Sequence, residues 1–145
     1  MKEEKSAGAI IFYKDKNEIK FLLLKYKNYW GFVKGLIEEN ESIEDTIKRE
    51  TLEEANIEIK KFIPKFEFKQ HWFFKWEGKL VRKEAIFLLA EITKEQAEKV
   101  KISFEHEDFK WLNYNEAIKL IKIKNNKEML TEAHEFIKKG YQKTL

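Results

Sequence analysis

The chain of 145 residues contains no cysteine, only one proline and only five glycines. The absence of cysteine excludes disulfide bonds and thiolate metal sites, and it fits a protein of the cytoplasm. No apolar run approaches the roughly 20 residues that a membrane-spanning helix needs. The N-terminal sequence MKEEKSAGAI lacks the uninterrupted apolar segment of a secretory signal peptide. We therefore expect a cytoplasmic protein that does not contact the membrane.

Hydrophobic residues make up 43% of the chain and aromatic residues 14%, which excludes a disordered polymer. Charged residues make up 38%, but the two signs nearly balance and leave a net charge of +3. This excess is too small to indicate a nucleic-acid-binding surface by itself, although it suits a small polyanionic ligand. At this length we expect a single domain over residues 1–145.

The stretch from Gly35 to Ile57, GLIEENESIEDTIKRETLEEANI, carries the clearest local signals. Ser42 followed by Asp45 is typical of a capping box, and negative charge in a first turn suits the helix dipole. Asn56 tolerates the left-handed conformation that often ends a helix. Together these signals predict a helix over 43–55.

The predicted helix changes character along its inward face. At about 100° per residue, Ile43 and Ile47 share one stripe, which continues to Glu50 and Glu54, with Glu53 beside it. Carboxylates three and four residues apart repel one another, and burial increases that cost. Hard oxygen ligands of this kind suit Mg²⁺ or Mn²⁺. A solvated helix laced with salt bridges is the alternative, because charge runs usually indicate an exposed face.

Gly35, Glu41 and the segment RETLEEANI over 49–57 have the spacing of a known motif, and the stretch resembles the Nudix box of nucleoside-diphosphate-linked hydrolases. That pattern has an aliphatic residue where Thr51 stands and a glycine where Asn56 stands, while its glutamate spacings are intact. The resemblance implies a metal-binding helix rather than a solvated one. It also implies a three-layer α/β/α sandwich with a mixed β-sheet.

The remaining hydrophobic patterns predict strands and helices without regular alternation, which is typical of an α/β fold whose mixed sheet is flanked by helices. The expected strands are 6–13, 19–26, a β-prone stretch over 57–74 that Pro64 either breaks or confines to an edge, and 79–92. We expect a short helix or irregular structure over 93–100, a helix capped by Asn113 or Asn115 that reaches Ile121, and a helix over 126–139 ended by Gly140.

Residues 103–112, SFEHEDFKWL, predict a polar loop that enters a short strand. The segment is similar to one in Nudix enzymes that cleave diadenosine tetraphosphate, where a distant carboxylate reaches the metal site. The resemblance implies that Glu105 is a metal ligand and that Phe109 lies near the substrate base. Without it, a solvated loop is the simpler interpretation, and His106 is more typical of a hydrogen-bonded structural residue than of a ligand.

The segment before the helix, NYWGFVKG over 28–35, supplies further candidates. Gly35 allows the backbone to approach a ligand closely, and its carbonyl group suits a metal. Lys34 is a candidate phosphate contact, and Trp30 either packs in the core or faces the substrate. The related enzymes usually have proline where Val33 stands, so this loop loses a rigid φ angle.

An aromatic cluster over 71–76, HWFFKW, contains more large side chains than one face of a strand can bury. His71 and Phe74 are candidates to stack on a nucleobase, and nearby Lys83 is a candidate phosphate contact. The alternatives are packing between sheet and helix for the aromatic residues, and a charged edge strand for the lysine.

The resemblance implies metal-assisted hydrolysis of a polyphosphate anhydride with Mg²⁺, or alternatively Mn²⁺. It assigns catalytic roles to Glu50, Glu53 and Glu54, with Glu53 the first choice for the general base. The implied metal ligands are the Gly35 carbonyl and the carboxylates of Glu50, Glu53, Glu54 and Glu105. Arg49 is expected to orient these carboxylates by ion pairing, while Glu38 and Glu41 order the preceding loop.

The substrate implied by the resemblance is diadenosine tetraphosphate, cut asymmetrically to ATP and AMP. Hydrolysis of nucleoside triphosphates or of RNA 5′ ends is the alternative among enzymes, and such an RNA end is the one nucleic-acid partner we expect. A nucleotide-sensing or nucleic-acid-binding module is the alternative outside enzymes. Either a monomer or a homodimer is compatible with the sequence.

Overall fold

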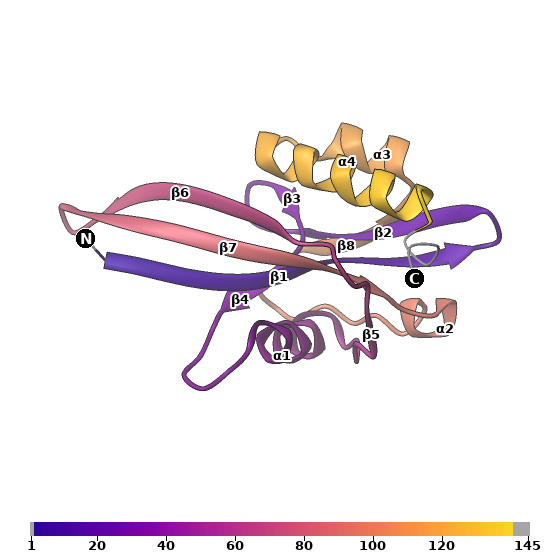
Figure 1. Ribbon diagram of the computed structural model, residues 1–145, viewed down its shortest axis with the longest axis horizontal. Coiled ribbons are helices and arrows are strands. Elements are labelled where there is room, and N and C mark those ends of the chain that lie inside the picture. The colour runs from indigo at the N-terminus through magenta and orange to yellow at the C-terminus, as the bar shows by residue number, and fades with distance from the viewer. Residues whose placement is uncertain (1, 141–145) are drawn as a thin grey trace.

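The computed structural model describes residues 2–140. Its centre is a mixed eight-stranded sheet with helices on both faces (Figure 1). Helices α1 (Ile43–Ala55) and α2 (Lys94–Ala97) lie on one face, and α3 (Tyr114–Leu120) and α4 (Lys124–Lys138) lie on the other. The predicted three-layer α/β/α sandwich is therefore confirmed.

The long strand β1 (Lys2–Asp15) organises the sheet. It runs parallel to β7 (Lys79–Glu91) along one edge. Along the other edge, its second half pairs with β2 (Glu18–Lys25) and its first half with β4 (Val33–Leu36), both antiparallel. The remaining strands are β3 (Trp30–Gly31) and β8 (Asp108–Leu112), which pair with β2, and β5 (Lys61–Phe62) and β6 (Phe68–Trp76), which pair with β7.

Alternation along β1 builds two cores, because successive side chains of a strand point to opposite faces of the sheet. Ile10 and Phe12 belong to the core under α3 and α4, which also contains Met129. Ile11 belongs to the core on the opposite face, together with Ile47 of α1. All five side chains are buried, so Ile47 fixes α1 on the sheet.

Both predicted ends of α1 are confirmed. The Ser42 side chain accepts a hydrogen bond from the backbone N–H of Asp45, and the Asp45 carboxylate accepts one from the backbone N–H of Ser42. Asn56 adopts the left-handed conformation, with φ of 59°. The orientation of the helix is thus fixed at both ends by local hydrogen bonding.

Other boundaries follow the sequence with small differences. Pro64 lies between β5 and β6, so it breaks the β-prone stretch into two strands rather than occupying an edge. Asn113, and not Asn115, caps α3. Helix α4 begins at Lys124, before the predicted start at residue 126.

Two features of the sheet were not predicted. The segment before α1 forms the short strands β3 and β4 instead of an irregular lead-in. The strand β1 begins at Lys2, and with β6 and β7 it forms a ribbon that projects beyond the helices, at the left of Figure 1. Over the described range 2–140, the helices are too short or too polar to cross a membrane.

Candidate active site

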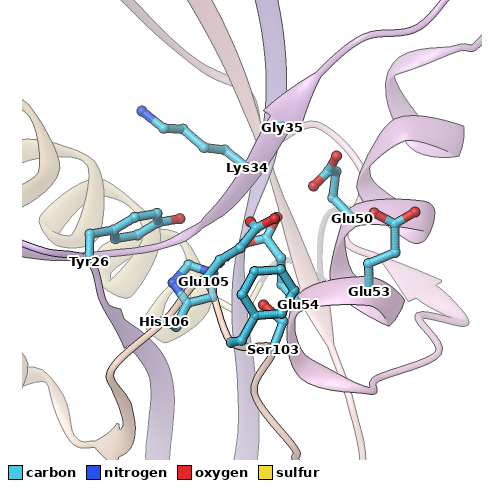
Figure 2. Close-up of a pocket in the computed structure, with 10 residues that line it drawn as sticks. Tyr26, Lys34, Gly35, Glu50, Glu53, Glu54, Ser103, Glu105 and His106 are labelled. Atoms are coloured by element: carbon cyan, nitrogen blue, oxygen red, sulfur yellow. The ribbon is translucent and has the colours of Figure 1, made fainter.

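A cleft of about 550 Å³ lies beside α1, between β4 and the loop that precedes β8 (Figure 2). Four separate parts of the chain contribute to it. Its lining residues are Tyr26, Lys34, Gly35, Glu50, Glu53, Glu54, Ser103, Phe104, Glu105 and His106. All five residues that were predicted to hold a metal therefore line a single cleft.

The three glutamates of α1 differ in exposure. The side chains of Glu50 and Glu54 are 16% and 6% exposed, whereas that of Glu53 is 60% exposed. The predicted continuation of the apolar stripe into acidic residues is thus confirmed for Glu50 and Glu54. Glu53 lies on the more open side of the cleft.

Gly35 brings the backbone of β4 against the acidic helix. A Cβ atom at this position would overlap the Glu50 carboxylate. The lack of a side chain at Gly35 is therefore what allows the Glu50 carboxylate to lie against the backbone of β4.

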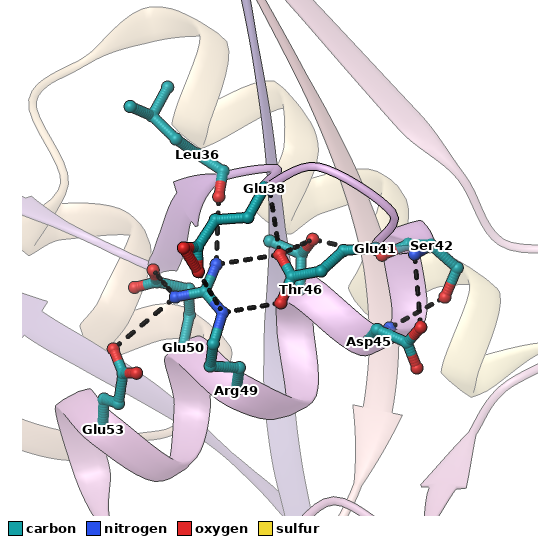
Figure 3. A network of polar contacts seen from close by, with 9 residues as sticks. All are labelled: Leu36, Glu38, Glu41, Ser42, Asp45, Thr46, Arg49, Glu50 and Glu53. Carbon is teal, nitrogen blue, oxygen red and sulfur yellow. Dashed lines mark hydrogen bonds and ion pairs between the residues drawn. The ribbon is translucent and has the colours of Figure 1, made fainter.

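Arg49 connects α1 to the loop before it (Figure 3). Its Nε donates to the Glu41 carboxylate at 2.7 Å, its Nη1 to Glu50 at 2.8 Å, and its Nη2 to the Leu36 carbonyl at 3.1 Å. Ion pairs with Glu38 at 3.1 Å and Glu53 at 3.6 Å complete the cluster. These are the contacts expected of a residue that orients carboxylates.

The Arg49 guanidinium also sets the charge state of its neighbour. Its hydrogen bonds lower the pKa of the Glu41 carboxyl to about 2, so this group is ionised throughout the physiological range. The hydrogen bond with Glu41 raises the pKa of Arg49 in turn. The loop and the helix are therefore joined by a pair that stays charged.

Glu54 has the most perturbed environment in the cleft. Burial, followed by the hydrogen bond and charge of Glu50 and the charges of Glu105 and Glu53, raises its pKa to about 10. A carboxyl group shifted in this way lacks positive charge nearby. The cleft therefore favours either a proton or a cation.

The residues fit a divalent metal by the chemistry of their donors. Four glutamates and the backbone of Gly35 line the cleft, and oxygen ligands are those that Mg²⁺ and Mn²⁺ prefer. Over residues 2–140, no three acidic or histidine side chains are already arranged to hold an ion. Glu50 and Glu53 instead contact Arg49, so binding requires their side chains to rotate.

A second, smaller cleft of about 290 Å³ adjoins the first, and Lys34 lines both. Its other lining residues are Tyr29, Gln70, Trp72, Ile123, Asn125 and Asn126. Lys34 Nζ lies 4.9 Å from the centre of the Trp72 ring. Lys34 is partly buried. This burial, and next the charge of Lys83, lowers the pKa of Lys34.

Two of the predicted substrate contacts lie beside the second cleft. Lys83 Nζ lies 5.5 Å from the Phe74 ring and 5.9 Å from the Trp72 ring. Trp72, Phe74 and Lys83 therefore share one face of the β6–β7 ribbon, next to Lys34. Cations over aromatic rings form a surface that suits both phosphate and a flat base.

The structure places the other three predicted substrate contacts outside both clefts. His71 points to the opposite face of β6 from Trp72 and contacts Arg82 at 3.2 Å and Glu84 at 3.4 Å. Trp30 packs against the core under α4, and Phe109 packs against the core on the α1 face.

Several lining residues were missed as site residues. Tyr26 sits at the end of β2, and Ser103, Phe104 and His106 flank the predicted ligand Glu105. His106 was expected to be a hydrogen-bonded structural residue rather than a ligand, and its Nε2 indeed lies 2.9 Å from Glu54 Oε1. Proximity to Glu105 in the sequence was the available signal for these neighbours, whereas nothing in the sequence indicated Tyr26.

Comparison with known proteins assigns the fold to a family. Residues 2–133 match the model of the NUDIX domain. The chain belongs to the Nudix family. This Nudix hydrolase is 34% identical over 143 residues to the asymmetrical bis(5′-nucleosyl)-tetraphosphatase of Sus scrofa, which covers 92% of this chain and 95% of that protein.

Two further relatives are informative. The crystal structure of a Caenorhabditis elegans Ap4A hydrolase binary complex superimposes with a TM-score of 0.74 at 27% identity, over 94% of this chain and 98% of that chain. The dihydroneopterin triphosphate diphosphatase of Haemophilus influenzae is 27% identical over 141 residues, 89% of this chain and 86% of that protein. The resemblance drawn from the Nudix box is thus confirmed at the level of the family.

Proposed function

We propose that this Nudix hydrolase is a single-domain, metal-dependent enzyme that cleaves diadenosine tetraphosphate asymmetrically to ATP and AMP. The observation that carries the proposal is the convergence of Glu50, Glu54 and Glu105 on one cleft, from a helix and a distant loop. The names of the porcine and nematode relatives support the choice of substrate.

Glu50, Glu53, Glu54, Glu105 and the Gly35 carbonyl are the groups that would hold Mg²⁺ or Mn²⁺. When bound, the ion would polarise the phosphoryl group and neutralise charge on the leaving phosphate. Arg49 holds Glu50 by a hydrogen bond, and His106 holds Glu54, so both buried carboxylates are already constrained. The contact with His106 limits the entropy lost when Glu54 becomes a ligand, whereas Glu50 must first rotate away from Arg49.

Glu53 is the carboxylate best placed to accept a proton from the attacking water. Its side chain is 60% exposed, and its only ion pair, within residues 2–140, is the long one of 3.6 Å to Arg49. Glu50 and Glu54 are more buried and more tightly bonded. A general base of this kind contributes about 10²–10⁴ to the rate.

The two adjoining clefts support a substrate that is longer than one nucleotide. Lys34 lies on the wall that they share, where it suits a phosphate of the bridging chain. The Trp72, Phe74 and Lys83 surface beside the second cleft suits the nucleoside at the far end of that chain. Recognition of both ends distinguishes a dinucleotide from a nucleoside triphosphate.

The test is a Mg²⁺-dependent assay on a substrate panel in ¹⁸O water. We expect diadenosine tetraphosphate to have the highest kcat/KM among dinucleotides, nucleoside triphosphates, dihydroneopterin triphosphate, sugar nucleotides and 5′-triphosphate RNA. The product that carries the ¹⁸O label identifies the phosphorus that the water attacks. A higher kcat/KM for dihydroneopterin triphosphate would overturn the substrate assignment in favour of the activity named for the bacterial relative.

A pair of variants tests the metal site itself. Glu54→Gln should abolish turnover while the protein stays folded, because an amide neither carries charge nor replaces a carboxylate ligand. Glu44→Gln, in the exposed first turn of the same helix, is the matched control and should retain full activity. Full activity of Glu54→Gln would exclude this residue from the metal site.

A further inference from the structure

The loop before β8 binds Glu54 at two points. The backbone N–H of Ser103 donates to the Glu54 carbonyl at 3.0 Å. The His106 ring, three residues further along, contacts the Glu54 carboxylate at 2.9 Å. Glu105 lies between these two anchors, so any movement of the loop relative to α1 would move Glu105 relative to Glu54.

The His106 contact is buried on both sides. The side chains are 3% exposed for His106 and 6% for Glu54. His106 Nδ1 is also buried and, over residues 2–140, has no hydrogen-bond partner. A proton on Nε2 leaves only a lone pair at Nδ1, whereas a proton on Nδ1 would leave a buried donor unsatisfied. The geometry therefore favours the tautomer in which Nε2–H donates to Glu54.

Tyr26 fixes the plane of the imidazole. Its ring lies edge-on to His106, with centroids 4.6 Å apart and an interplanar angle of 88°. The Tyr26 hydroxyl donates to the Phe32 carbonyl, which anchors the phenol ring in turn. The His106 ring is thus held by packing in the orientation that its hydrogen bond requires.

We propose that His106 is a positioning residue for the metal site of this enzyme. By donating to Oε1, His106 fixes one oxygen of the Glu54 carboxylate and leaves Oε2 free of this hydrogen bond. By belonging to the same loop as Glu105, it holds the distant carboxylate in register with the helix. The inference rests on the proposed metal-dependent function and assigns His106 no contact with the substrate.

The sharpest comparison uses two amides of different length. In His106→Gln the amide nitrogen reaches the place of Nε2 and can donate to Glu54, whereas in His106→Asn it stops nearer the place of Nδ1. His106→Phe keeps a flat ring against Tyr26 and removes the donor altogether. His134→Phe is the control, because this histidine stacks on Tyr114 on the opposite face of the sheet.

Mn²⁺ affinity, followed by electron paramagnetic resonance, is the primary measurement, since it does not depend on turnover. Loss of a hydrogen bond to a metal ligand typically weakens binding 10–100-fold. We expect the Kd for Mn²⁺ to rise about 10–100-fold in His106→Phe and His106→Asn, with most affinity retained in His106→Gln and all of it in His134→Phe. The thermal unfolding of each variant is also measured, and its midpoint should lie well above the temperature of the binding assay.

Two results would overturn the inference. One is an unchanged Kd for Mn²⁺ in folded His106→Phe, which would leave His106 a role in stability alone. The other, which applies even where His106→Phe fails to fold, is equal loss of affinity in the Gln and Asn variants. Failure of the wild-type protein to bind Mn²⁺ or to hydrolyse any nucleotide is a distinct outcome, and it would overturn the proposed function instead.

Discussion

Gly35 and Glu50 approach each other more closely than any side chain at position 35 would allow. A Cβ atom at Gly35 would overlap both Cδ and Oε1 of Glu50. Real Cβ atoms essentially never show such contacts, so the two positions are dependent on each other. The glycine that begins the Nudix box therefore serves to admit a carboxylate from α1.

The first prediction concerns this contact. Gly35→Ala should push the Glu50 side chain out of the cleft and away from Arg49, because the Glu50 carboxylate cannot share space with a methyl group. We expect kcat/KM and Mn²⁺ affinity to fall roughly 10–100-fold, as for the loss of other orienting contacts. Steady-state kinetics and Mn²⁺ titration measure both.

A control separates this effect from a general intolerance of substitution. Gly78, in the turn between β6 and β7, has φ of 76° and open space around it. Asparagine accepts that φ value better than other residues, so Gly78→Asn should leave activity unchanged. Wild-type kinetics in Gly35→Ala would show that the Glu50 carboxylate has room to adjust, and that the contact does not contribute to activity.

The second prediction concerns the shape of the Arg49 side chain. Lysine keeps the positive charge but cannot donate from several nitrogens in a fixed plane, so Arg49→Lys should release either the Leu36 carbonyl or one of the carboxylates. We expect kcat to fall roughly tenfold or more and the free energy of unfolding to fall by about 1–3 kcal/mol. Arg82→Lys, on the exposed ribbon, should change neither quantity appreciably. Equal effects of the two substitutions would contradict the orienting role.

The third prediction follows from the raised pKa of Glu54. Its carboxyl titrates near pH 10 in the folded chain and near 4.5 when unperturbed, so between these values the folded state holds a proton that the unfolded state has lost. The free energy of unfolding of the metal-free protein should therefore fall as pH rises through this window. Glu54→Gln removes this titration, so the variant should gain stability relative to the wild type as pH increases.

Urea denaturation in EDTA at several pH values between 5.5 and 9 measures this difference. Acid titration of Glu41, whose pKa is near 2, destabilises both proteins equally below pH 4.5 and does not interfere. A stability difference between wild type and Glu54→Gln that is constant across the range would show that Glu54 is ionised throughout.

Much of the fold was predictable because local signals coincide with the tertiary structure. The capping box at Ser42 and the left-handed Asn56 define α1 from sequence alone, and burial of Ile47 fixes its inward face. The strands β3 and β4 were not predictable in this way. They are short and exist because β1 and β2 offer free edges, which is a property of the assembled sheet.

The residues of the candidate site likewise include some that local sequence patterns bring together and others that only the folded chain brings together. Glu50, Glu53 and Glu54 share a helix, so helical periodicity brings them together. The contact of Tyr26 with His106 escaped prediction, because the two residues lie far apart in the sequence and no local pattern encodes their contact. His71 was predicted to contact the substrate, but the neighbouring Trp72 lines the second cleft instead. Adjacent residues of a strand point to opposite faces, and the sequence did not show which of the two would face the cleft.

The last prediction concerns Phe104, whose side chain is 98% exposed although it lines the cleft. Covering a large exposed apolar side chain with a flat ligand removes apolar surface from water, which favours binding. On the proposed function, Phe104 stacks on a nucleobase, which is worth about 1–3 kcal/mol. Phe104→Ala should therefore raise KM for diadenosine tetraphosphate roughly 5–150-fold while Mn²⁺ affinity and the unfolding temperature stay unchanged. Phe73→Ala, on an exposed phenylalanine that lines neither cleft, is the matched control. An unchanged KM in Phe104→Ala would mean that the base binds away from this loop, and the Trp72 and Phe74 surface would then be the place to test next.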